Sequence, residues 1–585
     1  MFIVNFLKLL VMYLFFTNTF ITAVDEDVFF RHLLTKTESA LTNELDKKIN
    51  LHPNIDIILI TARNECEKKF YEEVLDKQYA HLFRDDVQIK VIADAEGKGG
   101  FIGSTGGLLC ALAEIQNSYQ WTSVNGKDFK DLRIAVIKAG GMARRMIAAY
   151  AYANKCQMPI PLNRSDDILA STLYFAILNS YFFGQKMATM GFSGLIILCS
   201  DQLFLSDCEI KEGINYFVDP VSAVEAKRSE LIVEDSTSRE IVDFKRKPSP
   251  EVREQLMHKE ILQDKRVWSE LTNNYIIAGK SAEFLAMYAN YLEGASQIND
   301  LIKLADRGYE IFTSDCILPF FMNKDDYIAL RLAEYQTPHA QLSDTPEKRM
   351  LFYTKLYEIV RKSLNKSIYL CGNEEDTYCE ELVDTIRFYK NGLSAYSKVA
   401  QIYNLQNRFQ SKIGIESNIG ADCCIYQSFV ADGAIISDKC VILDSKIGAS
   451  SYIGEDSIII NVTGNVTLGS KRVLARVPII LEDKQAYVLI LVGIDDNPKH
   501  ENKSATIFGK SLQAWLNNKN IEINGDTLSL FTVPIFPVVF EDDINMDYVA
   551  WMITKDELPS EIYKNTKHFS LQEIIKLINY AAIAK

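Results

Sequence analysis

The sequence predicts a doubly wound α/β domain followed by a hexapeptide-repeat β-helix and a small α+β segment. Two observations predict this fold class. Short apolar runs alternate with helical periodicity between about residues 55 and 205, which is typical of parallel strands connected by helices. From residue 413 the period changes, and isoleucine or valine recurs every six residues with one interruption, which is typical of a β-helix.

The predicted elements follow from these periods. Residues 28–50, 63–83 and 166–187 have the apolar spacing of helices that pack on a core. Continuous apolar runs predict central strands at residues 55–61, 87–93, 134–137 and 194–199. Short alternating segments at 214–218, 231–233 and 241–244 predict a β-rich substrate insert, and a further strand begins at Asn273. The β-helix positions are Ile413, Ile419, Ile425, Ile435, Val441, Ile447, Ile453 and Ile459, which we expect to point inward at the corners.

These elements divide the chain into five predicted parts. The amphipathic segment 326–365 predicts that a helical connector separates the first domain from the β-helix. The parts are an apolar leader (1–24), an α/β domain (25–325), the connector (326–405), the β-helix (406–470) and a C-terminal α+β segment (471–585) that caps the open coil end.

Two glycine-rich turns are candidate phosphate or nucleotide sites. The loop 96–107 (EGKGGFIGSTGG) opens a helix, and the turn 139–141 (AGG) ends a buried strand. Glycines let the backbone approach a ligand closely with its N–H groups exposed. The alternatives are a flexible surface lid for the loop and an ordinary strand–turn–helix for the turn. The candidate nucleotide-binding residues are Gly103, Ser104, Gly106, Gly107, Gly140 and Gly141.

Basic side chains follow the second turn and gather in one later loop. Arg145 comes shortly after the AGG turn, and Lys155 lies ten residues further on. Arginine meets phosphate as a planar fork and lysine as a point charge. A second basic cluster, 245–247 (KRK), contains Lys247. The alternatives are solvated arginines after the turn and a solvated loop at the cluster.

Acidic and amide side chains follow predicted strands at positions where α/β sheets bind ligands. Asp201 closely follows the strand 194–199, and Asp315 follows the strand-like segment YEIFTS. Carboxylates there can hold Mg²⁺ together with substrate phosphates. For Asp201 the alternative is a cap on the next turn. Asn274, at the start of the strand from 273, is a candidate substrate ligand.

Five stretches in one order carry a resemblance to a known family. They are GKGGFIGSTGGLLCAL (97–112), AGGMARR (139–145), LIILCSD (195–201), FKRKPS (244–249) and TVPIFPV (532–538). In that order they resemble the GDP-L-fucose pyrophosphorylases, which are fucose-1-phosphate guanylyltransferases. The resemblance runs from about Ile55 to near the C-terminus and implies a Rossmann-like nucleotidyltransferase domain.

The resemblance also implies a reaction and roles for the candidate residues. The expected substrates are GTP and L-fucose 1-phosphate, and the products are GDP-L-fucose and pyrophosphate, formed by direct in-line displacement with Mg²⁺ as cofactor. Arg145 would clamp the triphosphate and Lys155 the α-phosphate. Asp201 would carry the metal, and Lys247 would approach the sugar phosphate.

Three residues depart from the family pattern. Ala143 stands where a hydroxyl residue is usual, Met146 replaces a proline, and Asn154 replaces the glycine before the lysine. Two alternatives therefore stay open. One is a non-catalytic homologue that binds sugar nucleotide or serves in assembly through the β-helix. The other is a pyrophosphorylase for another sugar or base.

Composition limits the partners and favours one compartment. A formal net charge of −14 argues against a nucleic-acid-binding protein, so anionic substrates must meet local basic clusters. The β-helix suggests a homo-oligomer. An odd count of eleven cysteines, with Cys110, Cys199 and Cys440 in apolar surroundings, favours free thiols and a reducing, cytoplasmic location. The leader 1–24 instead suggests a signal peptide, or a membrane anchor if it is retained.

Overall fold

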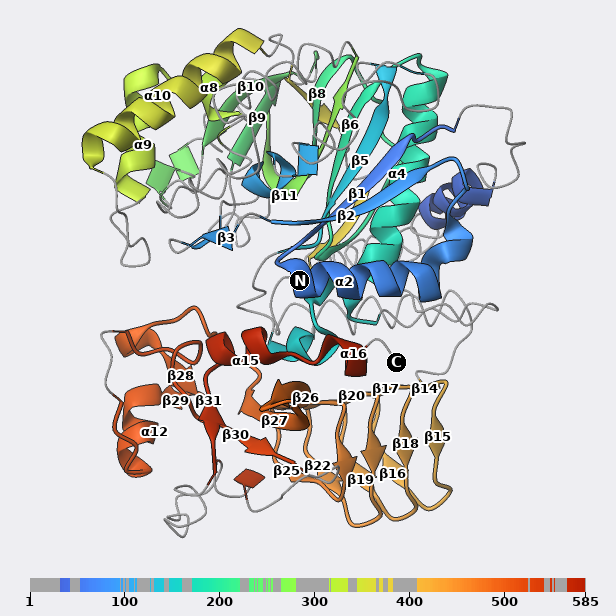
Figure 1. Ribbon diagram of the computed structural model, residues 1–585, viewed down its shortest axis with the longest axis vertical. Coiled ribbons are helices and arrows are strands. Elements are labelled where there is room, and N and C mark those ends of the chain that lie inside the picture. Colours follow the sequence, from blue (N-terminus) through green and yellow to red (C-terminus); the bar gives the residue numbers. More distant parts are fainter. Residues whose placement is uncertain are drawn as a thin grey trace, which may run out of the picture.

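The described residues of this computed structural model form two units (Figure 1). The first is a mixed α/β unit that ends at residue 381, and the second begins at residue 408. The structure describes residues 32–42, 53–94, 96–97, 100–101, 105–109, 111–112, 127, 131–140, 147–159, 171–220, 231–235, 237–238, 240–245, 249, 251–252, 254–255, 265–279, 315, 317–334, 345–363, 368–371, 377–381, 408–523, 527–540, 548–549, 552 and 566–583.

The first unit is built on a nine-stranded sheet. Its main path runs β10-β9-β11-β6-β5-β1-β2, and β8 joins β11 to β12. The four predicted central strands are parallel neighbours in the order β2-β1-β5-β6, which confirms the sequence prediction. The strands are β1 (Ile57–Ala62), β2 (Gln88–Ala93), β5 (Arg133–Lys138), β6 (Gly194–Cys199), β8 (Gly213–Pro220), β9 (Leu231–Asp235), β10 (Ile241–Lys245), β11 (Lys265–Ala278) and β12 (Ile368–Cys371).

Helices cover both faces of this sheet, which explains why its central strands are apolar throughout. Alternate residues of β1, β5 and β6 enter two separate apolar clusters, one on each face. Helices α2 (Glu65–Val74) and α4 (Thr172–Thr189) pack on the first face. Helices α9 (Lys324–Glu334) and α10 (Pro346–Ser363) supply side chains to the second, and the short α8 (Leu318–Phe321) lies with them.

Some element limits differ from those predicted. The helix predicted over 63–83 is α-helical only to Val74 and continues as a π-helix, Leu75–Tyr79, and a 3₁₀ turn, Ala80–Leu82. Within the predicted loop 96–107, β3 (Glu96–Gly97) and β4 (Gly100–Phe101) pair, and residues 105–109 are helical. The predicted connector 326–405 contains helices, but also β12 in the main sheet and β13 (Thr377–Glu381), which pairs with β7 (Gln202–Ser206). The hydrophobic period detected the helices and not these short strands.

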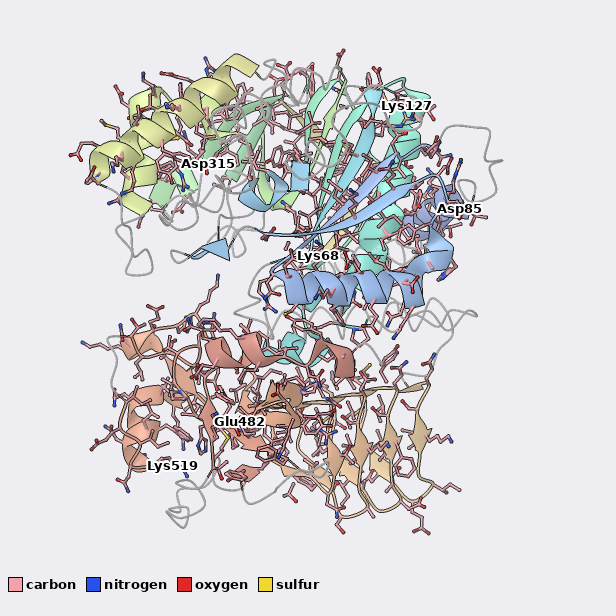
Figure 2. The ribbon with its side chains drawn as sticks, in the orientation of Figure 1. Lys68, Asp85, Lys127, Asp315, Glu482 and Lys519 are labelled. Carbon is pink, nitrogen blue, oxygen red and sulfur yellow. A yellow bond between two sulfur atoms is a disulfide. The ribbon has the colours of Figure 1, made fainter. Side chains whose placement is uncertain are left out.

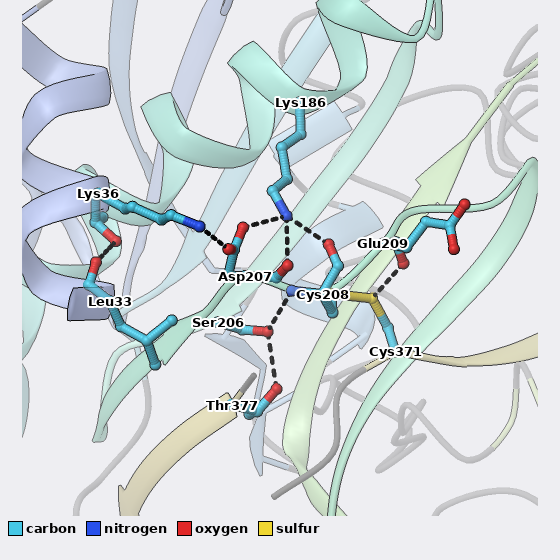
Figure 3. Close-up of polar contacts among 10 residues, drawn as sticks. Leu33, Lys36, Lys186, Ser206, Asp207, Cys208, Glu209, Cys371 and Thr377 are labelled. Atoms are coloured by element: carbon cyan, nitrogen blue, oxygen red, sulfur yellow. Dashed lines mark hydrogen bonds and ion pairs between the residues drawn. A yellow bond between two sulfur atoms is a disulfide. The ribbon is translucent and has the colours of Figure 1, made fainter. Parts of the chain in front are cut away.

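A cluster around Asp207 connects α4 and the helical residues 32–42 to the segment after β7 (Figure 3). The Lys186 ammonium, on α4, donates to the carbonyl oxygens of Asp207 and Cys208 at 2.7 and 2.6 Å. Lys36, in the helical residues 32–42, and Lys186 both pair with the Asp207 carboxylate. Burial alone would raise the pKa of Asp207, but the two lysines lower it below its ordinary value.

The same cluster contains a disulfide between Cys208 and Cys371 (Figure 3). It joins the segment after β7 to the end of β12, across 163 residues of sequence. The expectation that cysteines stay free is therefore wrong for this pair, because the sheet brings two cysteines together that are far apart in the chain. It is confirmed for Cys199 and Cys440. Cys110 lies outside the described residues.

The second unit begins as a coil of three parallel ladders, residues 408–468, which we call the coil. The chain visits the ladders in turn, and hydrogen-bonded partners such as Lys412 and Phe429 lie 17 residues apart. This arrangement is compatible with the predicted β-helix. The strands are β14 (Arg408–Phe409), β17 (Cys424–Tyr426), β20 (Val441–Leu443) and β23 (Ile458–Ile460); β15 (Lys412–Ile413), β18 (Phe429–Val430), β21 (Lys446–Ile447) and β24 (Thr463–Gly464); and β16 (Asn418–Ile419), β19 (Ile435–Ile436), β22 (Tyr452–Ile453) and β25 (Thr467–Leu468).

The interior of the coil matches the predicted pattern except at one position. Ile425, Ile447, Ile453 and Ile459 are fully buried, and Ile419 is partly buried because it lies in the first turn of the stack. Ile435 is 44% exposed, whereas its neighbour Ile436 is 1% exposed. One full turn of the coil takes 17 residues, which is one fewer than three six-residue repeats. The residue that points inward therefore shifts by one position, to Ile436, and Ile435 points outward.

The remainder of the second unit is α+β and adds to the coil's first ladder. Strand β26 (Arg472–Leu481) pairs with β23 in parallel, and β27 (Lys484–Gly493) returns antiparallel to β26. The other elements are β28 (Thr506–Ile507), β29 (Lys510–Ser511), α12 (Leu512–Asn518), β30 (Phe536–Val539), β31 (His568–Phe569), α15 (Leu571–Leu577) and α16 (Tyr580–Ile583). Figure 1 shows α15 and α16 at the side of this unit that faces α2. One apolar cluster runs through both units.

The predicted leader, residues 1–24, lies outside the described residues. Within the part of the chain that the structure describes, we find no helix of sufficient length and apolar character to cross a bilayer. The location of the protein stays a prediction.

We expect Ile447→Asp to destabilise the protein by several kcal/mol, because it places a carboxylate in the dry interior of the coil. Thermal and urea unfolding of the full chain would measure the loss. Lys446→Asp is the matched control, since this exposed neighbour lies on the same strand and on its outer side. Equal stability of the two variants would contradict the inward assignment of Ile447.

Candidate active site

The candidate site lies at the carboxyl edge of the four parallel strands. Arg63 follows β1, Asp94 follows β2, Ala139 and Gly140 follow β5, and Asp201 lies two residues after β6. Ligands of open α/β sheets bind at this edge, because the strand ends leave room between the connecting loops. Ala139 and Gly140 belong to the AGG turn, and Asp201 is a predicted metal ligand.

The structure brings the two glycine-rich turns together on the Asp94 side chain. A Cβ atom at Gly107 would lie 2.7 Å from Asp94 Oδ1. A Cβ atom at Gly140 would lie 2.7 Å from Asp94 Oδ2 and 3.2 Å from the carbonyl carbon of Ala62. A side chain at either position would therefore displace this carboxylate, and glycine leaves room for it. Gly106 lies beside Gly107 in the helical residues 105–109.

Asp94 carries an unusual charge environment. Its Oδ1 atom is buried and has no hydrogen-bond partner among the described residues. Burial, with a smaller effect from the neighbouring Glu67 carboxylate, raises the pKa of Asp94 to about 8. A carboxyl group whose pKa lies near neutral pH, at an edge of a sheet that binds ligands, is typical of functional sites. Structural ion-pair networks also produce such a pKa.

Glu67, in the first turn of α2, is the centre of a buried hydrogen-bond network. Its Oε2 accepts from the backbone N–H of Arg63, and its Oε1 accepts from Asn154 Nδ2 at 2.6 Å. Arg63 Nη2 lies 3.7 Å from Oε1. The side chain of Asn64 caps the helix by accepting from Glu67 N, which fixes where α2 begins. The side chains of Arg63, Glu67 and Asn154 are almost fully buried, so the donors and acceptors of the network depend on one another.

Asn154 connects this network to the segment that carries Lys155. Its Nδ2 also donates to the carbonyl oxygen of Ala139, at 2.9 Å, and so joins the AGG turn to the residue before Lys155. Lys155 begins the 3₁₀ turn Lys155–Gln157. On its other side, the Cys156 thiol contacts Tyr71 Oη at 2.6 Å. Both chain neighbours of Lys155 are therefore held by buried polar contacts.

Asp201 and Asn274 lie at the end of β6. Asp201 is 7% exposed, and its Oδ1 accepts from the Cys199 thiol at 2.8 Å. The Asn274 amide is fully buried: its Oδ1 accepts from Cys199 N at 2.5 Å and its Nδ2 donates to Gln202 Oε1 at 2.6 Å. Through these two hydrogen bonds the Asn274 amide holds the end of β6, which positions Asp201. Its role as a substrate ligand stays a prediction.

Asp315 is part of a buried ion pair in the second apolar cluster. Its Oδ1 lies 2.9 Å from Arg331 Nε and accepts from Tyr327 Oη at 2.9 Å, and all three side chains are fully buried. Figure 2 shows Asp315 beside the helices α8 to α10, whereas Lys68 lies on α2. The carboxylate is thus engaged with a cation and a hydroxyl of α9, an arrangement that does not fit a metal ligand.

Several predicted site residues cannot be placed. Gly103, Ser104, Gly141, Arg145 and Lys247 lie outside the described residues, as does the side chain of Lys155.

The donor set can be compared with what Mg²⁺ requires. Mg²⁺ prefers oxygen ligands and is commonly held by one or two carboxylates together with substrate phosphates. Asp201 fits this pattern. Among the described residues no group of three or more His, Cys, Asp or Glu side chains is gathered as for a metal ion.

Sequence reasoning did not identify Asp94, Glu67 and Lys138 as site residues. Asp94 ends a predicted strand in the same way as Asp201, so the same rule applies to it. Lys138, which is 8% exposed, precedes the AGG turn, and its Nζ lies 5.6 Å from the centroid of the Tyr275 ring. A charged residue that ends an apolar strand signals such a position. No sequence signal marks Glu67, because an acidic residue in the first turn of a helix is ordinary.

Comparison with known proteins identifies the family. The model of the fucose pyrophosphorylase domain matches residues 126–541, which is well over half of the chain. The chain belongs to the fucose pyrophosphorylase family. This match confirms the resemblance seen in the sequence and the broader prediction of a sugar-nucleotide pyrophosphorylase.

Individual relatives are distant. Fucose-1-phosphate guanylyltransferase of Mus musculus is 20% identical over 517 residues, covering 83% of each chain. Among solved structures, mannose-1-phosphate geranyltransferase from Thermus thermophilus matches with a TM-score of 0.24 and 10% identity. That match covers 75% of this chain and 96% of the other.

The raised pKa of Asp94 predicts how stability depends on pH. The folded protein holds a proton on Asp94 that the unfolded chain releases near its ordinary value, so this group lowers stability as pH rises from about 4 to about 8. We expect Asp94→Asn to remove that slope, which reaches about 1.4 kcal/mol per pH unit for one group. Urea unfolding at several pH values between about 5 and 8 would measure it.

The control for this experiment is Asp85→Asn, which changes an exposed carboxylate in the turn before β2. Stability curves of Asp94→Asn and wild type that run parallel across this pH range would contradict a protonated Asp94.

Proposed function

We propose that the protein is a fucose-1-phosphate guanylyltransferase, which forms GDP-L-fucose and pyrophosphate from GTP and L-fucose 1-phosphate. The observation that carries the proposal is the meeting of both glycine-rich turns on Asp94, beside the turn that begins with Lys155. Family membership and the name of the mouse relative support the choice of sugar and base.

The reaction requires two anions to be aligned and their charge neutralised. The sugar phosphate oxygen attacks the α-phosphorus of GTP in line with the leaving pyrophosphate, and no covalent enzyme intermediate forms. In this proposal Gly107 and Gly140 let the backbone approach the nucleotide. Arg145 clamps the triphosphate, Lys155 neutralises the α-phosphate, and Lys247 binds the sugar phosphate. Gly103, Ser104, Gly106 and Gly141 complete the proposed nucleotide site.

We assign Asp201 as the residue that holds Mg²⁺. The ion would neutralise charge on the phosphates and polarise the reacting phosphoryl group. The Cys199 thiol and the Asn274 amide hold the end of β6 and so orient this carboxylate. Asp315 is left out of the assignment because Arg331 and Tyr327 already occupy it.

A non-catalytic homologue is the second candidate function. It is favoured by the departures from the family pattern at Ala143, Met146 and Asn154. The contacts of Asn154 weaken this argument at one of the three positions. Its amide joins Glu67 to the AGG turn, so the residue that replaces glycine supports the turn before Lys155.

For the second unit, we propose that the coil is a β-helix and that it is an assembly surface for a homo-oligomer. Three parallel ladders with a 17-residue turn support the first part. Apolar side chains on the outside of two ladders, Phe429, Ile435 and Tyr452, support the second. Mass measurement in solution would test the assembly.

Pyrophosphate release by the purified full chain would test the proposed activity. We expect release with GTP, L-fucose 1-phosphate and Mg²⁺ together, and none when either substrate is omitted. Exchange of GTP for ATP, or of the sugar phosphate for mannose 1-phosphate, tests the choice of base and sugar. Faster release with an exchanged substrate would indicate another pyrophosphorylase, and no release with any pair would favour the non-catalytic homologue.

Neutralising the two proposed lysines should affect different steps. Lys155→Met removes a charge that stabilises the transition state, so kcat and kcat/KM should fall together by about a hundredfold or more. Lys247→Met removes ground-state binding, so the KM for fucose 1-phosphate should rise while the KM for GTP changes little. Steady-state kinetics with each substrate varied would separate these effects. An unchanged kcat in Lys155→Met, or a weakened GTP affinity alone in Lys247→Met, would contradict the assignment.

A further inference from the structure

Two side chains of the second unit are connected to the three residues directly before Lys155, one by direct contact and one through Arg63 and Glu67. These residues, Tyr152, Ala153 and Asn154, form a tight turn in which Asn154 N donates to the carbonyl oxygen of Tyr152 at 2.7 Å. Ala153 has φ of 64°, in the left-handed region that a residue with a Cβ atom disfavours by about 1 kcal/mol or more. A turn of this kind persists only where its surroundings hold it.

The first contact comes from the coil. Tyr152 Oη donates to the carboxylate of Asp444, which lies at a left-handed corner of the coil with φ of 46°. The neighbouring residues Ala149, Tyr150 and Ala151 are buried in the apolar cluster that continues into the coil. Strand β26 also packs on the 3₁₀ turn Ile147–Tyr152. The segment before Lys155 thus lies between the sheet and the second unit.

The second contact comes from α16 and passes through buried groups. Tyr580 Oη accepts from Arg63 Nη2 at 2.5 Å, and its ring packs on Phe70 of α2, with ring centroids 5.6 Å apart. Arg63 is 2% exposed and pairs with Glu67, whose Oε1 accepts from Asn154. Burial alone would lower the pKa of Arg63, but Glu67 and Tyr580 raise it, so the guanidinium stays charged.

We propose that Asp444 and Tyr580 are positioning residues of the nucleotidyltransferase site, and that the second unit sets the place of Lys155 through them. The inference rests on the proposed function for the role of Lys155. The two contacts hold the turn on both sides of Ala153. Asp444 contacts Tyr152 directly, and Tyr580 acts on Asn154 through Arg63 and Glu67. Neither positioning residue touches substrate, and both act through the backbone that leads to the lysine.

The variants remove one contact each with little other change. Tyr580→Phe keeps the ring on Phe70 and deletes the hydroxyl, which leaves a buried Arg63 donor unsatisfied. Asp444→Gly deletes the carboxylate and tolerates the left-handed corner. The matched controls are Tyr487→Phe, which deletes a hydroxyl of β27 that accepts from Gln485 at the surface, and Asp422→Gly, an exposed residue at another left-handed corner with φ of 56°.

We expect each positioning variant to lower kcat about three- to tenfold and to leave the KM of both substrates within about twofold, because small misplacement of a catalytic group acts on the transition state. Combined with Lys155→Met, neither change should lower kcat further, since the residue that they position is already gone. A general loss of structure would reduce activity in both backgrounds. The two controls should match wild type.

An activity-independent measurement separates this inference from the proposed function. Amide hydrogen exchange of residues 147–157 in the full chain should become at least severalfold faster in Tyr580→Phe and Asp444→Gly, and stay unchanged in the controls. Unchanged exchange in both variants would overturn the inference, whether or not the wild type turns over. A wild type that releases no pyrophosphate, with faster exchange in the variants, would overturn the proposed function and leave the two contacts established.

Discussion

The buried carboxylate of Glu67 is the constraint on which the candidate site depends. A fully buried carboxylate is costly unless several donors surround it, and here Arg63 and Asn154 supply them. The donors come from the end of β1 and from the turn before Lys155, while Asn64 fixes the start of the helix that carries Glu67. Three segments of the chain therefore share one electrostatic requirement, and none of them can move without leaving a buried group unpaired.

Much of the fold follows directly from periodicity. The four central strands are apolar throughout because helices cover both faces of their sheet, and this pattern is visible without any structure. The pattern of the coil is equally visible in the sequence, because one apolar side chain must point inward on each side of every turn. The failure at Ile435 has a simple cause, because a count of six per side does not reveal that the turn closes after 17 residues.

The site could be predicted only in part, and the reason differs between residues. The glycine-rich turns have a composition that signals close approach, but the sequence does not show that both approach the same carboxylate, Asp94. Asp315 has the spacing of a ligand after a strand, yet its partner Arg331 comes from a helix that only the tertiary structure brings near. Contacts such as Tyr580 to Arg63 span 517 residues, and no local pattern encodes them.

The disulfide between Cys208 and Cys371 encloses the strands β8 to β11 and the helices α8 to α10 in a covalent ring. Closing a ring of 163 residues removes conformational freedom from the unfolded chain, by a chain-entropy estimate of about 5 kcal/mol. The ring contains the predicted sugar side of the sheet but neither the AGG turn nor Lys155. Reduction of this bond by ambient thiols would return that freedom to the unfolded chain, and it would leave the segment of the AGG turn and Lys155, which lies outside the ring, covalently unchanged.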